Sequence, residues 1–234
     1  GIKKPKIAMT LFKEEKKVSE FKDVLKKKSY EVYVFNELNS YPCSPEKVLS
    51  EEGFGQYDLI ETKNNLVVVS APGGDSGKMG FCISQLYLNS LKSVPCGFAK
   101  FETLPVWNLP LAHPLNVSYE FATVNTRDDN LLDKLFLEST GKDSVTYNRD
   151  VENHIVLTNL LSRIFGRKIY ESPTEMGINM IKEGIVNDEI VLEASMAEIK
   201  RRFDFYKSHI SGEKEKNNFQ RAQELILKYN LTFE

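Results

Sequence analysis

A strand, an amphipathic helix and a second strand are predicted within the first 35 residues of this 234-residue chain. The strands cover Lys6–Leu11 and Glu31–Phe35, and the helix between them covers Glu14–Lys28. Two strands joined through a helix run parallel, so this βαβ unit favours a fold with a parallel sheet. Four apolar residues recur at the spacing of one helical face: Val18, Phe21, Val24 and Leu25.

The most hydrophobic short run, Leu66–Ser70, is predicted to be a central strand that leads into a glycine-rich turn. A helix is predicted from about Gly77 to Ser93. This layout is typical of a phosphate-binding loop, because backbone N–H groups in the turn and at the helix N-terminus converge on an anion. The residues predicted to bind the phosphorylated ligand here are Gly73, Gly74, Asp75, Ser76, Gly77 and Lys78.

The segment departs from the standard pattern G-x-x-x-x-G-K-[ST] at two positions. Pro72 stands in place of the first glycine, and Met79 replaces the hydroxyl residue that would bind Mg²⁺. Asp75 also places a negative charge within the loop. We expect phosphate or nucleotide binding, while a plain strand-to-helix turn, with Asp75 capping the helix, stays open.

Further along the chain, Cys96–Phe101 is predicted to be another strand, and Thr103–Pro114 a proline-rich loop packed on the sheet. From Val117 onward the pattern is mostly helical, with a polar linker at 211–218. The helices are predicted over residues 117–124, 129–139, 150–165, 187–208 and 219–229.

The predicted fold class is therefore α/β. We expect a mostly parallel, Rossmann-like or P-loop-like sheet with helices on both faces, followed by a helical C-terminal portion. Residues 1–125 would form the α/β core that contains the phosphate loop. Residues 126–234 would form a mainly helical portion packed on this core, and one single domain stays open as the alternative.

Charge and cysteine content narrow the function classes. The chain has 31 basic and 33 acidic residues, a net charge of −2, so we expect neither nucleic acid nor membrane as a partner. No apolar run approaches the ~20 residues that span a bilayer. The three cysteines, Cys43, Cys82 and Cys96, show neither zinc-site nor disulfide spacing, which favours reduced thiols in a cytoplasmic protein.

Ordered blocks from about residue 7 to residue 208 resemble a mainly bacterial protein family, the domain-of-unknown-function family eighteen forty-six. The blocks are Ser50–Gly55, Ile60–Thr62, Ser70–Met79, Cys82–Tyr87, Ala99–Thr103, Pro105, Trp107–Asn108, Pro110–Leu111, His113–Pro114, Asn116, Tyr119–Glu120, Ala122–Thr123, Tyr147–Glu152, Ser172–Met180 and Arg201–Arg202.

The resemblance implies a nucleotide-type site without an established reaction. It also implies a longer family protein, of which this chain would be the central portion. Three departures from the family pattern point toward weakened or lost catalysis. Gly74-Asp75-Ser76 stands where the family has Pro-Gly-Ser, Phe136 replaces a histidine, and Asn125 replaces an aspartate.

Polar residues at the end of the strand Cys96–Phe101 are candidates for catalysis. Lys100 would pair with a phosphate, Glu102 would act as a base or metal ligand, and Thr103 would lie beside them. A surface Lys–Glu pair is the structural alternative. His113 is a candidate acid or base, with Asn116 and Glu120 on the following helix as pocket residues; a structural histidine stays open.

A second group of candidates precedes predicted helices. Arg149 offers a fork for phosphate, and Asn148 would line the site. Asn148 or Asp150 would cap the helix. Ser172 and Thr174 open another helix whose donors would face an anion. The acidic residues Asp128, Asp129 and Asp133 favour a helix N-terminus, with a Mg²⁺ site as the alternative.

We expect from these residues an enzyme that binds ATP, another nucleotide or a phosphorylated small molecule and performs phosphoryl or nucleotidyl transfer, with Mg²⁺ for a triphosphate. Lys100 and Arg149 would neutralise developing charge, and Glu102 or His113 would transfer the proton. A non-catalytic nucleotide-binding or assembly module and a nucleotide phosphoesterase stay open. So does a homo-oligomer.

Overall fold

The computed structural model describes residues 4–73 and 76–233, and about half of this part of the chain is helical. It divides into two compact units, Gly1–Phe98 with Val156–Ile169 and Ala99–Ile155 with Tyr170–Glu234. The predicted domain boundary at residue 125 stays a prediction, because a compact unit is not by itself an independently folding domain.

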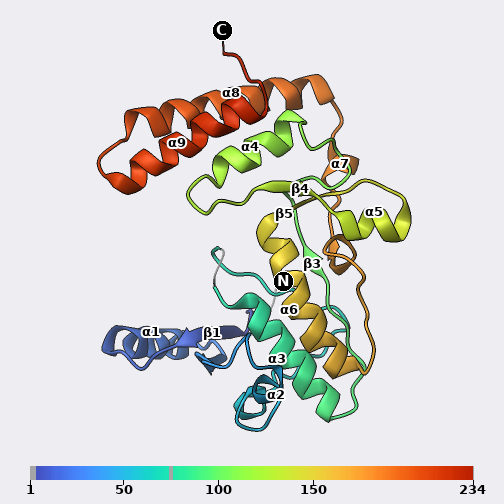
Figure 1. The fold of residues 1–234 in the computed structure, drawn as a ribbon. Coiled ribbons are helices and arrows are strands. Elements are labelled where there is room, and N and C mark those ends of the chain that lie inside the picture. Colours follow the sequence, from blue (N-terminus) through green and yellow to red (C-terminus); the bar gives the residue numbers. More distant parts are fainter. Residues whose placement is uncertain (1–3, 74–75, 234) are drawn as a thin grey trace. The chain divides into compact units, whose positions relative to one another are not determined.

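The first unit contains the predicted βαβ motif (Figure 1). Its strands pair in parallel, with Ile7 opposite Val32 and Met9 opposite Val34, as the sequence predicts. The elements are β1 (Ile7–Phe12), α1 (Lys16–Lys27), β2 (Val32–Asn36), α2 (Pro45–Val48), the 3-10 turn η1 (Phe54–Gln56), α3 (Lys78–Leu91) and the second half of α6 (Asn148–Phe165).

Aromatic side chains build the core of the first unit beside β2. Phe35 is buried, and its ring meets those of Tyr57 and Phe81 edge to face at 5.3 and 4.9 Å between ring centres. Val48, Phe54 and Ile83 are also buried. None of the residues of α1 is buried, so this core rests mainly on β2, η1 and α3.

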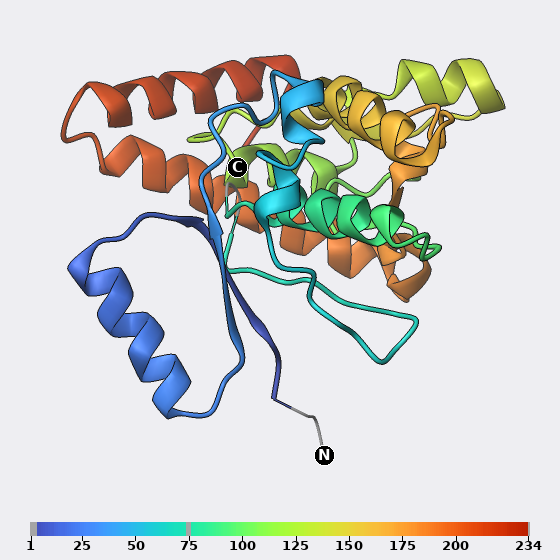
Figure 2. The ribbon, with the colours of Figure 1, turned by 90° about the horizontal axis from the view of Figure 1, so that it is seen from below.

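The predicted central strand Leu66–Ser70 is wrong, because these residues belong to no strand of the described chain. Leu66 and Val68 are 80% and 81% exposed. Figure 2 shows the chain from the end of η1 to Gly73 running out as an open loop. An apolar run favours an extended conformation, but a strand also requires a partner, which the run itself cannot specify.

The second unit contains two short sheets and most of the helices. Two-residue strands pair in parallel and three-residue strands pair antiparallel. The elements are β3 (Lys100–Phe101), α4 (Pro114–Ala122), β4 (Asn130–Leu132), α5 (Lys134–Thr140), β5 (Val145–Tyr147), the first half of α6, the 3-10 turn η2 (Thr174–Met176), β6 (Gly177–Ile178), α7 (Ile181–Gly184), α8 (Asp188–Ser208) and α9 (Glu213–Lys228).

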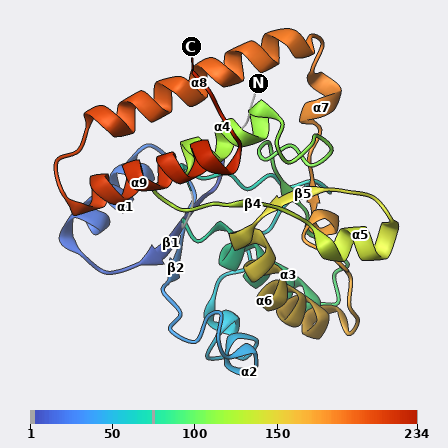
Figure 3. The same cartoon turned by 45° about the horizontal axis from the view of Figure 1, so that its top comes forward.

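Helices α4, α8 and α9 lie side by side in the second unit (Figures 1 and 3). They enclose a core of buried residues: Val117, Phe121, Val124, Ile199, Tyr206, Ala222 and Leu225. The carboxylate of Glu120 is buried and accepts hydrogen bonds from Lys228 (2.7 Å) and the Tyr229 hydroxyl, which fastens α9 to α4. A helical C-terminal portion is therefore confirmed.

Four further predictions need correction. The described residues form three two-stranded sheets, one of them antiparallel, in place of one large parallel sheet. The predicted strand Cys96–Phe101 is reduced to β3. Within the predicted helix 129–139, Asn130–Leu132 is strand β4, because Asp133 caps a helix that begins only at Lys134. The predicted linker 211–218 instead contains the start of α9, since Glu and Lys are good helix formers despite their polarity.

Candidate functional site

The phosphate-loop residues that the structure describes come together at the start of α3. Gly77 adopts a left-handed conformation (φ 75°), and a Cβ atom there would lie 3.0 Å from Cβ of Thr10, so glycine is required. The Lys78 ammonium donates to the Gly73 carbonyl (2.6 Å) and the Ser76 hydroxyl (3.1 Å). Gly74 and Asp75 lie outside the described residues.

In the second unit, a group of charged side chains surrounds Lys100. Its ammonium lies 2.8 Å from a carboxylate oxygen of Glu102 and also contacts the carboxylate of Asp150. The side chains of Lys100, Glu102 and Asp150 are only 13%, 12% and 1% exposed. One ammonium thus faces two carboxyl groups away from water, which leaves an excess negative charge that a proton can neutralise.

Electrostatics single out Glu102 as the group that takes this proton. Burial raises the pKa of the Glu102 carboxyl and the charge of Asp150 raises it further, against the opposing effect of Lys100. Burial alone would lower the pKa of Lys100, but Glu102 and Asp150 outweigh it and raise that pKa. Lys100 therefore stays charged, and Glu102 is the carboxyl group beside it whose pKa is raised.

Tyr147 connects this group to Arg149. The ring centre of Tyr147 lies 5.7 Å from the Lys100 ammonium and 5.8 Å from the Arg149 guanidinium carbon, so two cations flank one aromatic ring. Arg149 donates to a carboxylate oxygen of Asp128 (2.7 Å), which also accepts from the Tyr119 hydroxyl (3.1 Å). Burial is the first cause that raises the pKa of Tyr119 and of Tyr147, so both hydroxyls keep their protons.

The other oxygen of Asp128 is buried and has no hydrogen-bond partner among the residues that the structure describes. A buried carboxylate oxygen ordinarily accepts a hydrogen bond, and leaving it without one is costly. The group of Lys100, Glu102, Tyr147, Arg149 and Asp128 thus contains an acceptor that a ligand hydroxyl, an amine or a water would satisfy.

Other predicted site residues have structural hydrogen bonds in the second unit. His113 caps the N-terminus of α4, where its Nδ1 accepts the N–H of Leu115 (3.2 Å) and its Nε2 lies 3.4 Å from Asp188. Asn116 is fully buried and bonds both backbone groups of Val106. These contacts support the structural alternative for His113 and give Asn116 a structural role, and the predicted roles of both in a site stay predictions.

Asn148, Ser172 and Thr174 likewise support the backbone. The Asn148 side chain accepts the N–H of Asp129 (2.9 Å) and donates to the Arg127 carbonyl. These two bonds fix the segment that carries Tyr147 and Arg149. Thr174 donates through its N–H (2.9 Å) and its hydroxyl (2.7 Å) to the buried carboxylate of Asp133. The Ser172 hydroxyl accepts the N–H of Glu175 (3.2 Å).

Thr103 is exposed beside Glu102. Its carbonyl accepts a hydrogen bond from Asn179 (3.4 Å), and the position stays a predicted ligand contact.

The predicted acidic cluster separates into three structural pairs. Asp128 pairs with Arg149, Asp129 with Arg221, and Asp133 with Thr174. Within residues 4–73 and 76–233, no three His, Cys, Asp or Glu side chains gather as a metal-binding group. The Mg²⁺ alternative therefore receives no support from these residues, and metal binding together with a nucleotide stays a prediction.

Sequence reasoning missed Tyr147 and Tyr119 and treated Asp150 as a helix cap. The available signal was local: Tyr147–Asp150 places an aromatic, an amide, a cation and an anion in succession at the start of α6. A pattern within one segment does not reveal that Asp150 meets Lys100, which lies 50 residues earlier.

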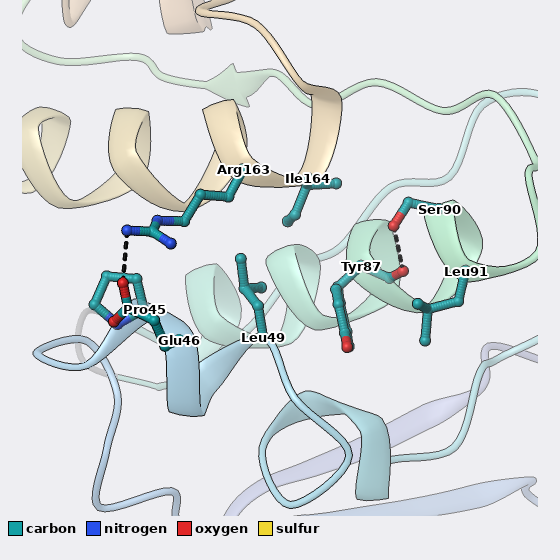
Figure 4. Close-up of a pocket in the computed structure, with 8 residues that line it drawn as sticks. All are labelled: Pro45, Glu46, Leu49, Tyr87, Ser90, Leu91, Arg163 and Ile164. Atoms are coloured by element: carbon teal, nitrogen blue, oxygen red, sulfur yellow. Dashed lines mark hydrogen bonds and ion pairs between the residues drawn. The ribbon is translucent and has the colours of Figure 1, made fainter.

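Two surface hollows are lined by none of these residues. One, of about 330 Å³, lies in the first unit between α2, α3 and α6, where Glu46 and Arg163 form an ion pair of 2.7 Å at its border (Figure 4). Its remaining lining is Pro45, Leu49, Tyr87, Ser90, Leu91 and Ile164. The other, of about 380 Å³, lies in the second unit and is lined in part by Arg202, His209 and Lys214.

Among the described helices, none combines the length and the apolar character needed to cross a membrane. The chain matches the N-terminal model of the domain of unknown function DUF1846 over residues 1–230. That model is of the N-terminal domain, which does not support our expectation of a central portion.

The chain is also similar to proteins named UPF0371. It is 45% identical over 197 residues to one from Streptococcus pyogenes serotype M28, covering 84% of this chain and 40% of that relative. It is 40% identical over 227 residues to one from Clostridioides difficile strain 630, covering 96% of this chain and 45% of the relative. The chain therefore spans less than half the length of these relatives, and it belongs to the DUF1846 family.

Proposed function

We propose that the chain binds a nucleotide or another phosphorylated small molecule at Gly73, Ser76, Gly77 and Lys78. The observation that carries this proposal is the position of the Lys78 ammonium. It lies at the first residue of a 14-residue helix and bonds the loop's own Gly73 carbonyl and Ser76 hydroxyl. A phosphate oxygen can replace these acceptors while the helix N-terminus supplies N–H donors and a favourable dipole.

The chemistry that we propose is phosphoryl or nucleotidyl transfer. We propose Glu102 as the proton-transfer residue, since burial raises its pKa. Lys100 and Arg149 are the residues that we propose for neutralising charge. A triphosphate ligand would bring Mg²⁺. The three free thiols fit our proposal of a cytoplasmic protein.

Calorimetric titration with ATP, GTP and pyrophosphate, each with and without Mg²⁺, tests the binding step. We expect saturable binding to the wild-type chain and a loss of at least tenfold in affinity for Lys78→Ala. Lys92→Ala is the matched control, because Lys92 is an exposed lysine at the other end of the same helix. Absence of binding by a wild-type chain that is folded by circular dichroism would contradict the proposal.

A non-catalytic nucleotide-binding module is the second candidate. It is favoured by the contacts of Lys100, whose ammonium is already held by both Glu102 and Asp150. Turnover separates the candidates. An enzyme releases product from ATP or GTP with Mg²⁺ and loses this activity in Glu102→Gln. A binding module binds the ligand without turnover, both as the wild type and as Glu102→Gln.

A further inference from the structure

The segment Leu66–Ser70 combines exposed apolar side chains with an unpaired backbone. Val67, Val68 and Val69 are 53%, 81% and 38% exposed. Across the described chain, no backbone hydrogen bond involves this segment, whether in a strand, a turn or a loop. β-branched residues favour strands, and a bare strand segment is a template for pairing with another strand. Leu66–Ser70 thus has the composition of a strand but no strand partner among the described residues.

A partner edge is available in the same unit. Among residues 4–73 and 76–233, β1 pairs with β2 alone, so the backbone donors and acceptors on the other edge of β1 have no strand partner there. The loop that contains Leu66–Ser70 is already hydrogen-bonded to residues near both ends of β1. The Lys6 ammonium donates to the Glu61 carbonyl (2.9 Å) at its start, and the Thr10 hydroxyl donates to the Ser76 carbonyl (2.6 Å) near its end.

These two attachments give the segment the direction and the length that a parallel neighbour of β1 needs. The chain passes from the start of β1 to its end between Glu61 and Ser76, in the same direction as β1 itself. Lys6 and Thr10 are about 13 Å apart along an extended strand, and Leu66 and Ser70, which also span five residues, would likewise be about 13 Å apart. The segment can therefore reach along the free edge without breaking either attachment.

We propose that Leu66–Ser70 docks in parallel on the free edge of β1, and that the docked strand positions Ser76, Gly77 and Lys78 for the phosphorylated ligand. The strand order would be β2, β1, Leu66–Ser70. The connection to β2 would then lead to one side of β1, and the connection to Leu66–Ser70 would lead to the other side. Ligands of open α/β sheets bind at the carboxyl ends of the strands at such a switch point. Thr10 and Gly77 already meet at this end of β1.

The ligand half of this inference rests on the proposed function. A ligand that binds better when the strand is docked must, by linkage, favour docking. We therefore expect the open segment in the free chain and the docked strand in the ligand-bound chain. Docking would also cover the valine side chains that are exposed in the open segment.

Amide hydrogen exchange of the 234-residue chain tests this coupling. Exchange is measured without ligand and with saturating ATP, GTP or pyrophosphate in the presence of Mg²⁺. We expect the amides of residues 67–70 to exchange at least tenfold more slowly with ligand. Binding with unchanged exchange overturns the docking inference and leaves the proposed function in place. Absence of binding by all three ligands overturns both.

A proline in the segment provides a second test that leaves the loop intact. Val68→Pro removes an N–H group and disfavours pairing within a sheet, but it disturbs no packed core because Val68 is exposed. We expect it to weaken ligand binding at least tenfold. Lys63→Pro, at an exposed bend of the same loop, is the control and should stay within twofold of wild type. Equal binding by Val68→Pro and wild type overturns the inference.

Discussion

At the scale of single residues, the buried charge group of the second unit determines how stability responds to pH. Burial raises the pKa of Glu102 above its ordinary value of 4.5, so the folded chain holds this proton more tightly than the unfolded chain. The stabilisation is present below pH 4.5 and is lost as the pH rises through the raised pKa of the folded chain.

Glu102→Gln should remove this loss of stability with rising pH. We expect the free energy of unfolding of the wild type to fall with rising pH above pH 4.5 relative to that of Glu102→Gln. Urea denaturation between pH 4 and 8 measures the difference. Glu152→Gln, at an exposed position of α6, is the control and should follow the wild type. Parallel curves for wild type and Glu102→Gln would contradict the raised pKa.

The buried hydroxyl of Thr174 makes a different kind of contribution. It donates to Asp133, and the Ser144 hydroxyl lies 3.1 Å away. Thr174→Val keeps the shape but leaves these buried polar groups with one donor fewer, which should cost about 1–3 kcal/mol. Thr126→Val, where the hydroxyl is exposed, should cost less than about 0.5 kcal/mol. Urea denaturation gives both values, and equal costs would contradict the role of the buried network.

The candidate site was predictable only where one segment contains the whole signal. Lys100 and Glu102 were placed together because both follow one predicted strand, and they form an ion pair of 2.8 Å. Asp150 and Tyr147 come from a distant segment, and no spacing rule connects them to Lys100. Residues such as His113 and Asn116 were singled out for their chemistry, but the backbone groups that they bond are visible only in the fold.

At the scale of elements, α9 shows how one helix face determines stability. Leu225 is fully buried against α4 and α8, whereas Leu227 is 77% exposed on the same helix. Leu225→Ala removes packed atoms and leaves a cavity, so we expect a loss of about 2–5 kcal/mol in the free energy of unfolding. Leu227→Ala should change it by less than about 0.5 kcal/mol. Similar losses for both variants would contradict the packing of α9.

Elements with an amphipathic pattern or clear end signals were predicted well from the sequence. The segments that became β1, α1, β2, α3 and α8 agree with their predicted spans to within a few residues. Prediction failed where a strand partner or a helix cap determines the secondary structure. Leu66–Ser70 has the composition of a strand without a neighbour, and Asp133 divides a helical pattern because its carboxylate accepts the N–H of Phe136.

At the scale of the whole molecule, the near-balance of charge favours our proposal of a nucleotide over a nucleic acid as ligand. With 31 basic and 33 acidic residues, the chain has no excess of cations for a row of backbone phosphates. The proposed loop instead relies on a few N–H donors and Lys78, which suffice for one phosphorylated small molecule.

Fluorescence anisotropy with a labelled 20-base-pair DNA duplex and a labelled single strand tests this distinction. We expect no saturable binding of either nucleic acid at 150 mM salt, under conditions in which calorimetry detects binding of ATP, GTP or pyrophosphate. Specific binding to a nucleic acid through several phosphates weakens steeply with salt, so the titration is repeated at 50 mM salt. Saturable, salt-dependent binding of the duplex would show that charge is concentrated on one surface and would contradict a ligand limited to a few phosphates.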